Sequence, residues 1–241
     1  AELLEELARV GGDVGAAGLL EELLQAAGLR EREAPVLAGS GHDLDLAIEH
    51  GPHGVGVEGS EGAVLEAHVL LALLEAAAQL KDRVTHLVLV GTAFPMKVSP
   101  VLIDNALNQP EKALQMINVF SRATLAPPPS ALGPGTWVHG ASLALGRRVL
   151  RSNPKVNVFH RGFVACDTYA NGEQAVREVT APILFALGTQ DQMTPARAAN
   201  SLIQAARASG KVVQVVHLPM GHHQMTETPE ELLAALRGFL A

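Results

Sequence analysis

The sequence predicts an α/β fold in which helices cover both faces of a parallel sheet. Three apolar runs, residues 86–91, 181–188 and 212–219, have the length and the Val, Leu and Ile content of buried strands. Helical patterns separate these runs, and strands that alternate with helices are typical of parallel sheets. The 241 residues, of which 48% are hydrophobic, suit one such domain with an inserted subdomain.

Several helices in the second half of the chain have recognisable start signals. Residues 194–195 are Thr-Pro, and residues 228–231 are Thr-Pro-Glu-Glu, which is the pattern of a capping box. Residues 99–100 (Ser-Pro) and 109–110 (Gln-Pro) are expected to begin helices as well. A further helical pattern extends over residues 160–179.

Residues 1–83 differ from the rest of the chain in charge and composition. They carry 5 basic and 16 acidic residues, a net charge of −11, whereas residues 84–241 carry 13 and 9, a net charge of +4. Every Phe, Trp, Tyr, Met, Asn and Thr follows residue 83. Because aromatic residues supply much of the buried area of a core, this N-terminal third is atypical and a poor candidate for the centre of a large sheet.

Local patterns in this acidic third still predict regular structure. Apolar residues at three- and four-residue spacing predict helices over residues 2–10, 18–29 and 63–80. Residues 34–38 and 53–57 are short strand candidates. The simplest interpretation is an acidic helical layer that packs on another part of the molecule.

Charge and cysteine content exclude several classes of function. The net charge of −7 leaves no basic stripe for binding phosphates, so we expect no nucleic-acid partner. Cys166 is the only cysteine, which excludes an internal disulfide and a cysteine metal cage and favours a reducing compartment. The first residues are acidic and amphipathic, unlike a signal peptide, and no apolar run is long enough to cross a membrane. We therefore expect a cytoplasmic protein with no membrane partner.

Three segments, in order and spacing, resemble landmarks of the α/β-hydrolase fold family: VTHLVLVGTAFPM (84–96), APILFALGTQDQMTP (181–195) and HLPMGHHQMTETPEELLAALRGFL (217–240). The family's acid lies in a Gly-x-x-Asp-x-x-Thr-Pro signature, which falls here on residues 188–195 and makes Asp191 the acid. Its histidine follows the last strand in a Gly-His step, which falls on Gly221 and His222. The resemblance implies an α/β-hydrolase-like parallel sheet.

The chemistry of these two residue types supports the same roles. Ligands of open parallel sheets bind beyond the carboxyl ends of the strands, and Asp191 and His222 both follow such ends. A carboxylate on one imidazole nitrogen fixes the tautomer while the other nitrogen takes a proton. The alternative is that Asp191 only shapes a turn and that His222 is a surface histidine. The neighbouring His223 is the less favoured histidine.

The family's nucleophile lies in a Gly-x-Ser-x-Gly turn between a strand and a helix. Ser60, in the segment Val-Glu-Gly-Ser-Glu-Gly, is the candidate in the right place. Glu58 occupies the position of the first Gly, and Glu58 and Glu61 would place negative charge beside a developing oxyanion. The alternative is that Ser60 caps the following helix. For the oxyanion loop, residues 36–42 are the nearest match.

The resemblance also implies a domain organisation and a function. Residues 84–95 and 180–241 would form the hydrolase core, residues 96–179 a helical cap, and residues 1–83 the acidic N-terminal region. The implied activity is hydrolysis of a small-molecule ester or related acyl bond by a Ser-His-Asp mechanism, with no metal or organic cofactor. The alternative is a catalytically silent protein that uses this fold to bind a ligand or partner.

The composition changes where the resemblance becomes firm, near residue 84. This coincidence suggests that residues 1–83 replace the family's original front half, through fusion, truncation or a shifted reading frame. Ordinary divergence explains the same observation equally well.

Overall fold

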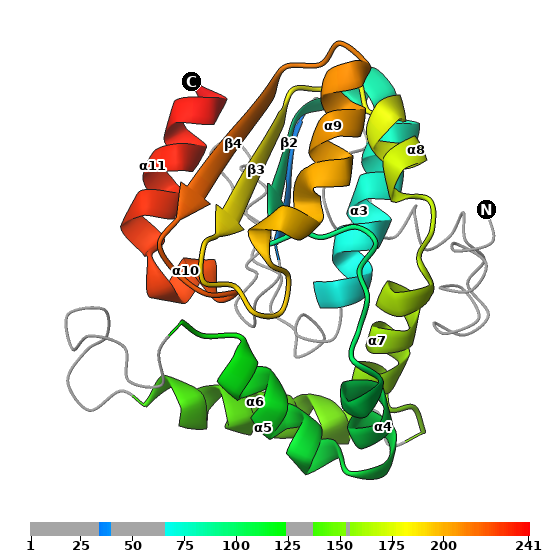
Figure 1. Ribbon diagram of the computed structural model, residues 1–241, viewed down its shortest axis with the longest axis vertical. Coiled ribbons are helices and arrows are strands. Elements are labelled where there is room, and N and C mark those ends of the chain that lie inside the picture. The colour runs from blue at the N-terminus through cyan, green and yellow to red at the C-terminus, as the bar shows by residue number, and fades with distance from the viewer. Residues whose placement is uncertain (1–33, 40–65, 124–136, 153–154) are drawn as a thin grey trace.

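The computed structural model describes residues 34–39, 66–123, 137–152 and 155–241 (Figure 1). The helices expected over residues 2–10 and 18–29 and the strand expected over 53–57 lie outside the described residues. Within the described part of the chain, no helix is long and apolar enough to cross a membrane.

In the part of the chain that the structure describes, four parallel strands form one sheet, in the order β1-β2-β3-β4. β1 spans Ala34–Gly39, β2 Val84–Val90, β3 Ile183–Gly188 and β4 Val213–Leu218. The strands expected around residues 34, 86, 181 and 212 are thus confirmed. β1, the only described strand from the acidic third, lies at one edge of this four-stranded sheet.

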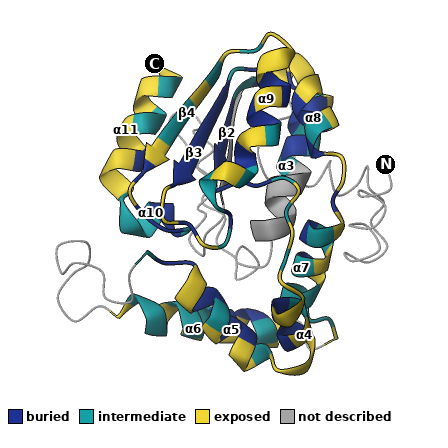
Figure 2. Cartoon of the chain, viewed as in Figure 1, coloured by how far each residue is buried: buried dark blue, intermediate teal, exposed yellow. Residues whose placement is uncertain are grey.

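Alternate residues of the central strands face two separate apolar cores, as the two-residue period of a strand requires. On one face, Leu87 and Leu89 of β2 pack with residues of β3, α3 (Glu66–Leu80), α8 (Gly172–Glu178) and α9 (Asn200–Ala208). On the other face, Val88 and Val90 pack with residues of β3, β4 and α11 (Pro229–Leu240). Figure 2 shows that β2 and β3, the strands between these layers, are buried.

The remaining long helices lie beyond the carboxyl ends of the strands, at the end toward which the arrows of Figure 1 point. They are α4 (Pro100–Asn108), α5 (Pro110–Phe120), α6 (Val138–Ser152) and α7 (Val158–Thr168), and we call them the helical layer. Both Xaa-Pro steps begin helices as expected, because proline lacks the N–H that a first turn leaves unbonded. The layer has its own apolar core around Leu102, Leu114 and Ile117.

Two details differ from the sequence-based expectation. Residues Ala196–Ala199 form a 3-10 turn before α9 begins at Asn200, so Thr194 does not cap an α-helix. Thr228 is the N-terminal cap residue of α11 but makes no side-chain cap bond, because its hydroxyl donates to the Met220 sulfur at 3.1 Å. The expected capping box is therefore not formed.

Candidate active site

Asp191 lies in the turn that follows β3, and its carboxylate is buried and fixed by the turn itself. Its Oδ1 accepts hydrogen bonds from the backbone N–H groups of Met193 at 2.9 Å and Thr194 at 2.8 Å. The residue is 5% exposed. These two bonds occupy Oδ1 and leave Oδ2 for other partners.

His222 follows β4, and its Nδ1 lies 2.8 Å from Asp191 Oδ2. Its backbone N–H donates to Ser121 O, at the end of α5, at 2.7 Å. The neighbouring His223 is 3% exposed and also donates its backbone N–H to Ser121 O, at 3.1 Å. Of the two adjacent histidines, His222 is the one whose ring is bonded to Asp191.

Thr194 joins both loops to the end of β2, a contact that the sequence did not indicate. Its hydroxyl lies 2.6 Å from Gly91 O, 2.9 Å from Asp191 Oδ2 and 2.9 Å from His222 Nδ1. A hydroxyl has one hydrogen to donate and two lone pairs that accept. Thr194 therefore adds a third fixed group to the Asp191–His222 pair. The only feature of the sequence that pointed to Thr194 was its position in the Gly-x-x-Asp-x-x-Thr-Pro signature.

Replacing Thr194 with Val removes the hydroxyl and keeps the branched shape. We expect T194V to lower the free energy of unfolding by about 1–2 kcal/mol, because the hydroxyl is buried and bonded to Gly91 O. Chemical denaturation measures the change, and T194S should recover most of it. If T194V were as stable as the unmodified protein, the Thr194 hydroxyl would not contribute to the stability of the site.

Two glycines let the histidine loop, which carries Gly221 and His222, come close to its neighbours: Gly188 at the turn that carries Asp191, and Gly221 at the segment after α5. A Cβ on Gly188, the last residue of β3, would lie 2.4 Å from Gly221 O and 2.7 Å from Met220 O. A Cβ on Gly221 would lie 2.5 Å from Ala123 N. The turn that carries Asp191 can therefore contact the histidine loop only because residue 188 has no side chain.

Ser60 lies outside the described residues, as do residues 40–42 of the proposed oxyanion loop. Cys166 does not substitute as a nucleophile, because burial, with a smaller effect of Asp167, raises the pKa of its thiol to about 12. Within the described residues, no group of three or more His, Cys, Asp or Glu side chains could hold a metal ion.

The aromatic and Met residues of the helical layer divide between core and surface. Phe159, Phe163 and Met116 pack against the core of the layer. Trp137 and Phe120 are 69% and 44% exposed.

Solved structures of hydrolases resemble this protein in fold. An esterase from Exiguobacterium antarcticum is 14% identical over 93% of this chain and 72% of its own, with a TM-score of 0.62. A hydrolase from Pseudomonas aeruginosa is 19% identical over 93% of this chain and 71% of its own, with a TM-score of 0.59. An esterase from a Rhodococcus species is 21% identical over 93% and 70%, with a TM-score of 0.57.

By sequence, no protein-family model and no curated protein matches the chain. The structural matches agree with a parallel sheet covered by helices. This chain has the α/β-hydrolase fold.

Proposed function

We propose that this protein hydrolyses an ester or a related acyl bond of a small molecule by a Ser-His-Asp mechanism. The observation that carries the proposal is the bond between Asp191 Oδ2 and His222 Nδ1, at the carboxyl edge of a parallel sheet. Bonding at Nδ1 leaves Nε2 as the nitrogen that takes a proton from a nucleophile and returns it to the leaving group.

In this mechanism Asp191 orients His222 and stabilises the imidazolium that forms during the reaction. Asp191 is suited to this role because two backbone N–H groups hold its carboxylate and because its side chain is fully buried. His222 is suited to proton transfer because its side chain retains 13% exposure, so one part of the ring can meet a substrate.

Ser60 is our proposed nucleophile. Residues 40–65 connect β1 to α3. The carboxyl end of β1 lies at the same edge of the sheet as the loops that carry Asp191 and His222, which we call the dyad. Ser60 belongs to this connection between a strand and a helix, and the family's nucleophile also lies between a strand and a helix. A catalytically silent binding protein is the second candidate function, and the observation that favours it is the pair of carboxylates, Glu58 and Glu61, beside Ser60.

We also propose that residues 96–179 act as a cap and that the protein works in the cytoplasm. The position of the helical layer beyond the carboxyl ends of the strands supports the first point (Figure 1). The free Cys166 thiol agrees with a reducing compartment.

Labelling with a fluorophosphonate tests the proposal, because such probes react with activated serines. We expect the probe to modify Ser60, as identified by mass spectrometry of the labelled peptide, and short-chain aryl esters to be turned over. S60A should abolish both, and S130A is the matched control. A label on another serine would keep the hydrolase proposal and move the nucleophile. A folded protein with neither label nor turnover would favour the silent binding protein.

A further inference from the structure

Two chain segments that are distant in sequence meet behind His222. One is the end of α5 and the residues after it, Ser121–Ala123, and the other is the histidine loop with α10 (Gln224–Glu227). Ser121 O accepts the backbone N–H groups of both His222 and His223. The backbone position of His222 therefore depends on the carbonyl of the residue that caps the C-terminus of α5, a helix of the layer.

The Glu227 carboxylate bonds to both segments at once. Its Oε1 accepts the Ala123 N–H at 2.8 Å, and its Oε2 accepts the Gly221 N–H at 3.1 Å. Gly221 immediately precedes His222 in the chain. Glu227 thus links the residue next to the histidine to the segment that follows α5, through two oxygens of one side chain.

The packing around this link leaves little room for the two segments to shift. A Cβ on Gly221 would lie 2.8 Å from the carbonyl carbon of Arg122 and 2.5 Å from Ala123 N, so the two backbones touch. The Arg122 guanidinium is also buried, and it donates to Thr226 at 3.3 Å and to Ser142 of α6 at 3.1 Å. Arg122 therefore connects the turn that carries Glu227 to a second helix of the layer.

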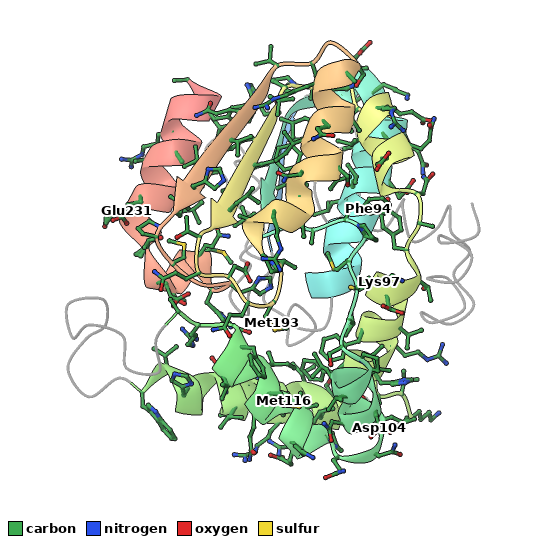
Figure 3. The ribbon with its side chains drawn as sticks, viewed as in Figure 1. Phe94, Lys97, Asp104, Met116, Met193 and Glu231 are labelled. Atoms are coloured by element: carbon green, nitrogen blue, oxygen red, sulfur yellow. The ribbon has the colours of Figure 1, made fainter. Side chains whose placement is uncertain are left out.

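The acid side of the site contacts the same layer through an apolar side chain. Met193, two residues after Asp191, packs on the core of the layer around Leu102, Leu114 and Ile117. Figure 3 labels Met193 between the sheet and the helical layer, above Met116 of α5. This apolar contact has no preferred direction, whereas the two hydrogen bonds of Glu227 fix direction and distance.

We propose that Glu227 is a positioning residue. By accepting hydrogen bonds from the Gly221 and Ala123 backbone N–H groups, it fixes the position of His222 relative to the end of α5. This proposal rests on the proposed function and deepens it, because it makes the geometry of the base depend on the position of the layer. Glu227 lies behind the dyad and is not itself a group that transfers protons to substrate.

The burial of the Glu227 carboxyl group agrees with a role in geometry rather than in stability. Burial raises the pKa of Glu227, and the nearby Asp191 raises it as well, although the Ala123 and Gly221 N–H groups and Arg122 oppose the shift. A carboxylate that is costly to bury is retained where two backbone amides need acceptors in a fixed arrangement.

Replacing Glu227 with Gln tests the proposal at constant size. Glutamine offers one acceptor oxygen and a donor NH₂, so one of the two backbone N–H groups would face another donor. Glu231, exposed in the first turn of α11 and labelled in Figure 3, provides the matched control E231Q. The two readouts are ester turnover and the NMR signal of the His222 Nδ1 proton that faces Asp191, assigned by its loss in His222→Gln.

We expect E227Q to lower kcat by about a hundredfold with KM nearly unchanged, because misplacement of a catalytic group by about 1 Å has that effect. The His222 proton signal should shift or broaden, and E231Q should leave both readouts unchanged. If E227Q does not fold, E227D keeps both oxygens but is one methylene short, and the same change of the signal is expected.

An E227Q or E227D protein with the unmodified signal and kcat would overturn the proposal, even if its melting temperature were lower. The NMR readout needs only folded protein. If the unmodified protein turned over no ester, the proposed function would fail, and the signal of His222 would still decide whether Glu227 positions it.

Discussion

The D191N variant is expected to lose about four orders of magnitude in kcat for any ester that the unmodified protein hydrolyses. Asp191 Oδ2 lies 2.8 Å from His222 Nδ1 and accepts a hydrogen bond from it in the proposed mechanism, whereas an asparagine NH₂ in that position would donate and favour the wrong tautomer of the ring. The fold should survive, because the amide oxygen of Asn can still accept from the Met193 and Thr194 N–H groups.

Asp104 provides the matched control for this substitution. It is an exposed aspartate of α4 that accepts a bond from Asn108 at 2.8 Å, and Figure 3 labels it at the far end of the helical layer. D104N should retain the activity of the unmodified protein. If D191N, folded by circular dichroism, were equally active, Asp191 would have no part in the mechanism.

The strands of the core could be predicted because their sequences satisfy two burial requirements at once. Leu87 and Leu89 face one apolar core, and Val88 and Val90 face the other, so the strand reads as an uninterrupted apolar run. The same reasoning succeeds for β3, whose six residues are all buried. β4 is less buried, and its apolar run was still long enough to be recognised.

The Asp191–His222 pair could be predicted because parallel strands bring their carboxyl ends to one edge. β3 and β4 are neighbours in the sheet, and Gly188 pairs with Leu218, so the loops after them must lie close together. The closeness of Asp191 and His222 follows from their positions after two strands and from the order of those strands. Both can be inferred from the sequence when the fold family is recognised.

The contacts behind the pair could not be predicted, because they join segments with no shared pattern. Glu227 and Ala123 are 104 residues apart, and nothing in the composition of either segment indicates the partner. Thr194 was expected to begin a helix, whereas its hydroxyl bonds to Gly91 O, a partner fixed only by the packing of β2 beside β3. Such bonds depend on tertiary distances that local sequence does not encode.

The approach of the two loops gives the second large expected effect, through Gly188→Ala. The added Cβ would lie 2.4 Å from Gly221 O and 2.7 Å from Met220 O, both backbone atoms of the histidine loop. Because backbone cannot rotate away as a side chain can, the loop itself must move. We expect G188A to lower the free energy of unfolding by about 1–3 kcal/mol, the usual effect of overpacking.

The same displacement should abolish turnover, because Gly221 precedes His222 and carries it away from Asp191. Gly238→Ala is the matched control: a Cβ there, in α11, meets nothing within 4 Å. Alanine is the better helix former, so G238A should raise stability by up to about 1 kcal/mol and leave activity unchanged. Denaturant unfolding and ester turnover of both variants give the comparison. If G188A matched G238A in stability and turnover, the spacing of the two loops would not depend on Gly188, and the close backbone contact would not be what holds Asp191 against His222.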